Sequence, residues 1–199
     1  MKPTIEQICA AFHRGANSAF KLNSEWSGGE WLNAAPEYLL TTKVCEAIGK
    51  LDGSHYVSLE YSTEATVDEA GVRGRGPLPW DMRPDGKIDI LVWNGTPKPR
   101  GIIEIKSQNF GFSKLASDVR RIEKIMGRNS SIKFGGVGVY LDRGRESRKR
   151  TAKETLANAL KNLEKSFSKR SKCQWRTFPS KMHGDDKDAW ATLFAVTEG

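Results

Sequence analysis

Two strand-like segments joined by an Asn-Gly turn restrict the fold of this chain more than any other feature. Lys87–Trp93 and Gly101–Lys106 are short, largely apolar segments rich in β-branched residues, in which charged residues recur on one side at a period of two, as expected of β-strands. Asn94-Gly95, which follows the first segment, is a strong turn signal. We therefore predict an antiparallel hairpin in which Asp89 and Glu104 are able to face the same side.

Two charged residues interrupt the second segment of this hairpin. Glu104 and Lys106 are two positions apart, so they share one face of the strand, whereas Ile103 and Ile105 take the opposite face. Burying such ions without compensation costs on the order of several kcal/mol per ion. We infer that the two residues serve chemistry rather than stability, with a metal ion as one means of compensation.

The periodicity of the remaining chain predicts an α/β protein. We expect a mixed β-sheet flanked by helices, with an αβββαβ core that is followed by a C-terminal helix and strands. The 199 residues suit one domain. We divide it into a core of about 36–142, an N-terminal helix 4–15 and a basic C-terminal extension 143–199. The other expected helices are 36–48, 113–126 and 151–167. The other expected strands are 55–62, 134–141, 173–178 and 189–196. Loops are expected at 22–31 and around His183.

One carboxylate of the helix 36–48 falls on its apolar side. On a helical wheel, Leu40, Thr41, Val44 and Ile48 lie within about 60° of Glu37. We expect Glu37 to point toward the core, either as a functional carboxylate or as a first-turn residue stabilised by the helix dipole.

Positive charge is concentrated in one part of the chain. The net charge is +8, and residues 143–176 contain 12 Lys or Arg against three Glu, a balance of +9, so the remainder carries about −1. Such segregation favours a polyanionic partner, and a solvated helix face is the alternative. The residues that we expect to contact phosphates here are Arg143, Arg145, Arg148, Lys149, Arg150 and Lys153.

A long connection over residues 63–86 precedes the hairpin. It contains four Gly and three Pro. Connections of this length are usually functional or disordered. We predict a flexible basic flap that binds phosphates through Arg73 and Arg75.

Cysteine usage and hydropathy indicate the compartment. Cys9, Cys45 and Cys173 form no C-x-x-C pair, which argues against a disulfide framework or a structural zinc site and favours buried thiols in a reducing compartment. No apolar run approaches the length of a membrane span, and the N-terminal segment lacks a signal-peptide core. We expect a cytoplasmic protein without a membrane partner.

The element order and its acids resemble those of a known nuclease superfamily. A helix carrying Glu37 precedes three strands, of which the second carries Asp89 and the third Glu104-x-Lys106, and a helix and a strand follow. Over roughly residues 36–141 this order resembles the PD-(D/E)XK nuclease superfamily. The literal Pro-Asp pair is Pro84-Asp85, four residues before Asp89. We assign the acid of the motif to Asp89 and keep Asp85 as the second choice.

The resemblance implies a restriction endonuclease-like fold and a metal-dependent, endonuclease-like phosphodiesterase that cuts DNA rather than RNA. Asp89, Glu104 and the backbone carbonyl of Ile105 would bind Mg²⁺, with Mn²⁺ as a substitute. Lys106 would orient the attacking water or offset the developing charge.

Three further residues have less certain roles under the same resemblance. Glu37 would hold a water molecule next to the ion or a second ion, and Glu60 competes with it for this role. Gln108 matches a polar residue that follows the motif in some members. Of the three acid-x-Lys sequences in the chain, only Glu104-x-Lys106 lies inside an apolar strand, and we therefore prefer it to Asp85-x-Lys87 and Asp185-x-Lys187.

Other functions stay open on the sequence alone. The charged residues of the hairpin also fit a buried ion-pair network in a non-catalytic nucleic-acid-binding module. A basic interaction domain that meets an acidic protein is a third class. A homodimer would suit an endonuclease because cutting both strands of a duplex takes two sites.

Overall fold

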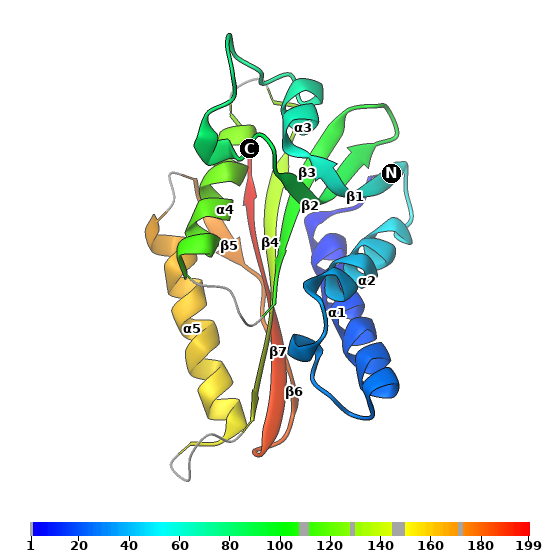
Figure 1. Ribbon diagram of the computed structural model, residues 1–199, viewed down its shortest axis with the longest axis vertical. Helices are drawn as coiled ribbons and strands as arrows, with labels where there is room; N and C mark the ends of the chain where they lie inside the picture. Colours follow the sequence, from blue (N-terminus) through cyan, green and yellow to red (C-terminus); the bar gives the residue numbers. More distant parts are fainter. Residues whose placement is uncertain (1, 108–111, 128–129, 145–149, 171–172) are drawn as a thin grey trace.

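The computed structural model has a mixed β-sheet at its centre, with helices packed on both faces (Figure 1). It describes residues 2–107, 112–127, 130–144, 150–170 and 173–199. Within these ranges the sheet has seven strands, which confirms the α/β class. The strands are β1 His55–Ser62, β2 Lys87–Asn94, β3 Pro99–Lys106, β4 Phe134–Gly144, β5 Trp175–Thr177, β6 Lys181–Gly184 and β7 Asp188–Glu198.

The predicted hairpin forms one side of the sheet. The strands lie in the order β1-β2-β3-β4-β7-β5, and β6 pairs with another part of β7. β2 and β3 are antiparallel with Ile90 opposite Ile103, as the Asn-Gly turn predicts. β3 and β4 are parallel, and the other described strand pairs are antiparallel. β7 pairs with β4 along its whole length, so the C-terminal part of the chain belongs to the sheet itself.

Four long helices cover the sheet. α1 (Ile5–Ser27) and α2 (Glu37–Gly49) lie on one face, and α4 (Phe112–Ile125) and α5 (Ala152–Arg170) lie on the other (Figure 1). Ile90, Ile103 and Ile105 are buried against the α1 and α2 side, whereas Leu91 and Ile102 are buried against the α4 and α5 side. Because side chains alternate along a strand, Glu104 and Lys106 emerge on the α4 side, opposite Ile103 and Ile105 as predicted.

The first helix is longer than the expected 4–15. Its start is confirmed: the Thr4 hydroxyl accepts from the Gln7 amide and the Gln7 side chain accepts from the Thr4 amide. The helix then continues through Gly15 to Ser27, so the expected loop 22–31 is helical over its first six residues. Gly15 lies inside the helix, at the point where α1 packs closely against α2. A Cβ added at Gly15 would lie 2.5 Å from the Cα of Val44 on α2.

Two segments expected to be irregular contain short regular elements. In the connection 63–86, residues Thr63–Glu69 form α3 and Trp80–Met82 form a 3-10 helix, η2. The guanidinium of Arg73 lies 2.7 Å from a carboxylate oxygen of Glu64 and 2.7 Å from one of Asp68. Arg73, predicted to bind phosphates from a flexible flap, is therefore ion-paired within the protein. The polar loop expected around His183 is strand β6, which pairs with β7. A second 3-10 helix, Leu32–Ala34, leads into α2.

Burial agrees with the predicted core. The stripe of α5 is buried at all four expected positions, namely Leu156, Leu160, Leu163 and Phe167. Cys9 and Cys45 are buried free thiols, and Cys173 is half-buried. Within the described ranges, no helix combines the length and apolar character needed to cross a bilayer.

Candidate functional site

Three carboxylates occupy neighbouring positions on three adjacent strands. The register places Leu59 and Tyr61 of β1 opposite Ile90 and Ile88 of β2, so Glu60 is level with Asp89. Continuing the β2–β3 register in the same way sets Asp89 level with Glu104. Glu60 has φ 52°, in the left-handed region that a residue with a side chain rarely adopts. Such strain is concentrated at functional sites in proteins.

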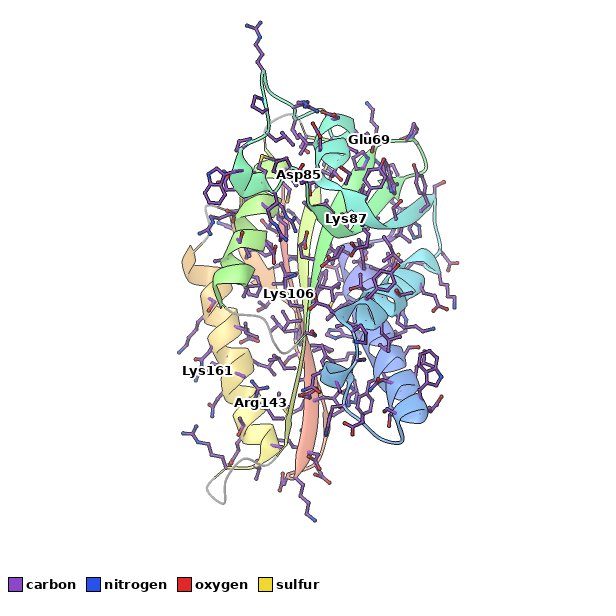
Figure 2. The ribbon with its side chains drawn as sticks, viewed as in Figure 1. Glu69, Asp85, Lys87, Lys106, Arg143 and Lys161 are labelled. Carbon is purple, nitrogen blue, oxygen red and sulfur yellow. The ribbon has the colours of Figure 1, made fainter. Side chains whose placement is uncertain are left out.

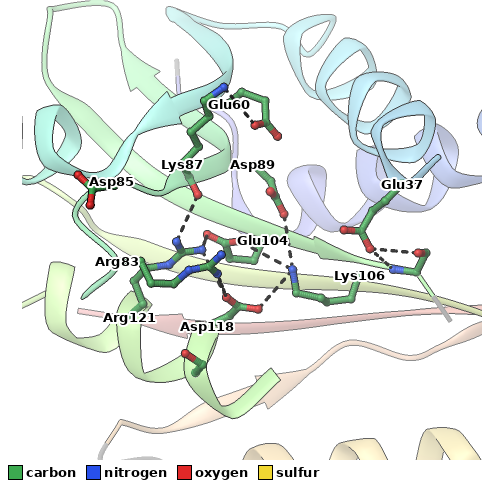
Figure 3. Close-up of a pocket in the computed structure, with 12 residues that line it drawn as sticks. Glu37, Glu60, Arg83, Asp85, Lys87, Asp89, Glu104, Lys106, Asp118 and Arg121 are labelled. Atoms are coloured by element: carbon green, nitrogen blue, oxygen red, sulfur yellow. Dashed lines mark hydrogen bonds and ion pairs between the residues drawn. The ribbon is translucent and has the colours of Figure 1, made fainter. Parts of the chain in front are cut away.

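The ammonium of Lys106 lies among the carboxylates of Asp89, Glu104 and Asp118, whereas Glu60 is paired with Lys87 at 3.7 Å (Figure 3). Its Nζ is 3.3 Å from Asp118 Oδ2, 3.8 Å from Asp89 Oδ2 and 4.0 Å from Glu104 Oε2. It also donates to the carbonyl of Ile105 at 2.8 Å, while the Ile105 amide donates to Asp89 at 2.7 Å. Both backbone groups of Ile105, including the predicted metal-ligand oxygen, therefore belong to the network.

Two residues of this network were missed by the sequence reasoning. Arg121 of α4 is 1 % exposed, and its Nη2 lies 2.5 Å from Glu104 Oε1 and 3.4 Å from Asp118 Oδ1. Asp118, 2 % exposed, is also 3.3 Å from Arg83. The signal was present, because on a helical wheel Asp118 lies only about 60° from Leu115 at the edge of the apolar stripe.

Glu37 reaches the site from the opposite helical layer. It is exposed rather than core-facing, which corrects the prediction, because it occupies the first turn of α2 and bonds to the residue that follows β3. Its Oε2 accepts from the backbone amide of Ser107 at 2.7 Å and from the Ser107 hydroxyl at 3.0 Å. Glu37 thus fixes the end of β3, directly after Lys106.

These residues line one open pocket of about 790 Å³. The walls carry four cationic side chains and six carboxylates, a formal excess of two negative charges. The six acids are Glu37, Glu60, Asp85, Asp89, Glu104 and Asp118. Asp85 is exposed and points away from Lys106, whereas Asp89 points toward it (Figure 3). The geometry therefore favours Asp89 over Asp85 as the partner of Glu104 and Lys106.

Burial and mutual repulsion shift the titration of the central groups. Burial raises the pKa of Glu104 well above its ordinary value, and the charge of Asp89 adds to the shift against the opposing effect of Arg121. Burial also raises the pKa of Asp89 more than Lys106 lowers it. The pKa of Lys106 is raised, since the surrounding carboxylates, Asp118 first, together outweigh the opposing effect of burial. Perturbed groups gathered in one pocket are typical of functional sites.

Comparison with known proteins adds no assignment to this geometry. No protein-family model matches the chain, and no curated protein or solved structure is significantly similar to it.

The donor atoms of the pocket fit a hard divalent cation. Proteins bind Mg²⁺ through one or two carboxylates, with water and phosphate oxygens completing the coordination. Asp89 and Glu104 offer two carboxylates on neighbouring strands, and the formal excess of two negative charges matches such an ion. In the part of the chain that the structure describes, no group of three or more His, Cys, Asp or Glu side chains is arranged as a metal site. Two carboxylates would leave the other positions of an octahedral ion to water or phosphate oxygens.

The predicted phosphate-binding residues are spread over the molecule. Arg75 is exposed in the connection after α3, and Arg150 and Lys153 are exposed at the start of α5. Arg143 is half-buried and donates to the carbonyl of Asp142. In the view of Figure 2, Arg143 and Lys161 lie below Lys106, away from Asp85 and Lys87. The predicted residues Gln108, Arg145, Arg148 and Lys149 lie outside the described residues.

Proposed function

We propose that this chain is a divalent-metal-dependent nuclease that hydrolyses phosphodiester bonds, with DNA as its substrate. The observation that carries the proposal is the arrangement at the end of the hairpin. Asp89 and Glu104 are side by side on β2 and β3, and the ammonium of Lys106 lies within 4.0 Å of both in an open pocket. Acids beside an amine in a solvent-accessible pocket are the groups that phosphoryl chemistry needs.

The strand topology supports a restriction endonuclease-like fold as part of this proposal. The chain contains a helix, an antiparallel β1-β2-β3 unit, a helix, and a strand β4 that is parallel to β3. This is the αβββαβ order on which the resemblance to PD-(D/E)XK nucleases rests. The free thiols of Cys9 and Cys45 support a cytoplasmic location within the same proposal.

Each residue of the pocket has a role that its contacts suggest. Asp89 and Glu104 would hold Mg²⁺ or Mn²⁺, which supplies activation of water near neutral pH and charge stabilisation for the scissile phosphate. Lys106 would orient the attacking water or offset the negative charge that develops on the phosphate oxygens. Asp118 would keep the Lys106 ammonium in place, and Arg121 would fix the Glu104 carboxylate. Neither of these two needs to touch the substrate.

Surface charge supports a polyanionic substrate. Arg75, Arg150 and Lys153 are exposed, and α5 carries further basic residues such as Lys161. Contacts of this kind bind phosphates without reading sequence, and their contribution falls as the salt concentration rises. A homodimer, which would bring two pockets to the two strands of a duplex, is part of the proposal for double-strand cleavage.

A second candidate is a non-catalytic nucleic-acid-binding module on the same fold. The observation that favours it is the pairing of Glu104 with Arg121 at 2.5 Å, which already satisfies one predicted metal ligand within the protein. In this arrangement Arg121 compensates the buried charge of Glu104 without any metal ion. This module would bind DNA with a steep salt dependence and would show no EDTA-sensitive cleavage.

The deciding experiment is cleavage of linear, circular and branched DNA with Mg²⁺ or Mn²⁺ and with EDTA. We expect cleavage by the wild-type protein and at least a hundredfold loss in Lys106→Ala and Asp89→Asn, with binding and folding retained. Lys187→Ala is the matched control, because Lys187 belongs to the exposed Asp185-x-Lys187 sequence outside the pocket. Unchanged cleavage in the two pocket variants would place the active site elsewhere, and binding without any cleavage would establish the second candidate.

A further inference from the structure

Trp80 is the most exposed large apolar side chain among the described residues. It is 87 % exposed, whereas a tryptophan in a soluble domain is normally highly buried. An isolated exposed aromatic residue carries little meaning unless the backbone holds it in place and its surroundings are those of a site. Both conditions are met at Trp80.

The turn that carries Trp80 is anchored on both sides. It is the first residue of η2, where the amide of Met82 donates to the Pro79 carbonyl and the amide of Arg83 donates to the Trp80 carbonyl, both at 2.9 Å. Met82 is buried in the core, and Asp81 is ion-paired with Lys124 of α4. The Trp80 ring is therefore exposed from a fixed backbone rather than from a loose loop.

The same turn leads directly into the pocket. Arg83 ends η2 in a left-handed conformation with φ 54°, lines the pocket and lies 3.3 Å from Asp118. Trp80 is three residues earlier, which corresponds to about 6 Å along a 3-10 helix. A strand whose phosphate enters the pocket past Arg83 would bring a neighbouring nucleotide to Trp80.

We propose that Trp80 stacks on an unpaired base of the DNA strand that enters the pocket, so that the protein prefers single-stranded or frayed DNA to a closed duplex. This inference rests on the proposed nuclease function, whose substrate it specifies. A base paired inside a duplex has both faces covered by its neighbours, so only an unpaired base offers a face to the indole. Arg75, which is exposed, precedes Trp80 in the sequence and Arg83 follows it, so positively charged residues flank Trp80 along the chain.

The test measures binding separately from cleavage. An end-labelled 12-nucleotide single strand and the duplex of the same sequence are titrated in EDTA with the wild-type protein and with Trp80→Ala and Trp80→Phe. Trp26→Ala is the matched control, because Trp26 is also exposed, at 71 %, but lies at the far end of α1 outside the pocket. Thermal unfolding of each variant confirms that the fold is retained.

We expect Trp80→Ala to bind the single strand at least about fivefold more weakly, the lower end of the effect of removing one aromatic–base stack. Trp80→Phe should recover part of the loss, and duplex binding should change less than twofold. The slope of log affinity against log salt should stay unchanged in Trp80→Ala, whereas Arg83→Ala should reduce it by about one.

Three outcomes would overturn the inference: equal losses on single strand and duplex, no loss relative to Trp26→Ala, or no single-strand binding by the wild type at low salt. A loss confined to an acidic protein partner would instead assign Trp80 to a protein interface. The titrations contain EDTA, so single-strand binding can depend on Trp80 even if the protein does not cleave DNA. Conversely, the protein can cleave DNA even if Trp80→Ala binds the single strand normally. The two proposals therefore fail separately.

Discussion

Asp118 on α4 lies 3.3 Å from the ammonium of Lys106 at the end of β3. This contact joins the helix that follows the hairpin to the strand that carries the Glu-x-Lys sequence. Both side chains line the pocket, and Asp118 is almost fully buried there. This contact and three others in the protein have consequences that can be measured.

Asp118→Asn should lower kcat for DNA cleavage by about 10- to 100-fold, the usual effect of removing a group that orients a functional side chain. The reason is that Lys106 loses the carboxylate that holds its ammonium in the pocket. KM should change less than kcat, and Asp118→Glu should recover part of the rate. Asp185→Asn, at an exposed acid outside the pocket, is the control. Equal kcat in Asp118→Asn and the wild type would show that the contact has no role in positioning.

Arg121→Met should lower the free energy of unfolding by about 3 kcal/mol at neutral pH, because Glu104 is left buried without its counter-ion. The double variant Arg121→Met with Glu104→Gln should recover most of this loss. Urea denaturation measures both. Lys124→Met, which breaks only the half-exposed pair with Asp81, should cost less than about 1 kcal/mol. A double variant as unstable as the single one would show that Arg121 contributes through packing alone.

His13 should make the protein less stable as the pH falls below neutrality. Burial lowers the pKa of His13 from 6.5 to about 4, with Lys181 and His183 adding to the shift, and its Nδ1 lies 2.6 Å from Thr192 Oγ1. The unfolded chain therefore takes up a proton below pH 6.5 that the folded protein excludes until about pH 4.

The contribution of His13 is fully present above pH 6.5 and is lost as the pH falls toward 4, by at most about 3 kcal/mol. Urea denaturation of the wild type and of His13→Gln at several pH values tests this, since the variant should lack that part of the loss. His55→Gln, at a histidine that is not among the causes of the His13 shift, should keep it. Parallel curves for the wild type and His13→Gln would contradict the assignment.

Gly15→Ala should lower the melting temperature, although alanine favours a helix by about 1 kcal/mol over glycine. The added Cβ would lie 2.5 Å from the Cα of Val44, so α1 and α2 would have to separate. Overpacking of this kind typically costs about 1–3 kcal/mol. Gly74→Ala is the control because no atom lies within 4 Å of its added Cβ. A higher melting temperature for Gly15→Ala would mean that the helices yield without cost.

Short-range patterns predicted most of the elements of this fold. The alternation in Lys87–Trp93 and the Asn94-Gly95 turn indicated the β2–β3 hairpin, and the apolar spacing indicated α2, α4 and α5. The extent of α1 was not predictable from its own residues, because glycine is the usual end of a helix. Only the contact with Val44 explains why Gly15 lies inside it. β6 was missed because its sequence is mostly polar and lacks the alternating apolar residues typical of a strand. It is a strand because it pairs with β7.

Side chains alternate at a period of two along a strand, and this local rule was enough to place Glu104 and Lys106 on one face. The turn signal was enough to place Asp89 on the neighbouring strand. The residues that surround these three could be known only from the folded structure. The positions of Asp118 and Arg121 next to Lys106 and Glu104 depend on how α4 packs on the sheet. The contact of Glu37 with Ser107 depends on where α2 begins relative to the end of β3. Such placements arise from packing between segments distant in the chain, which local periodicity does not encode.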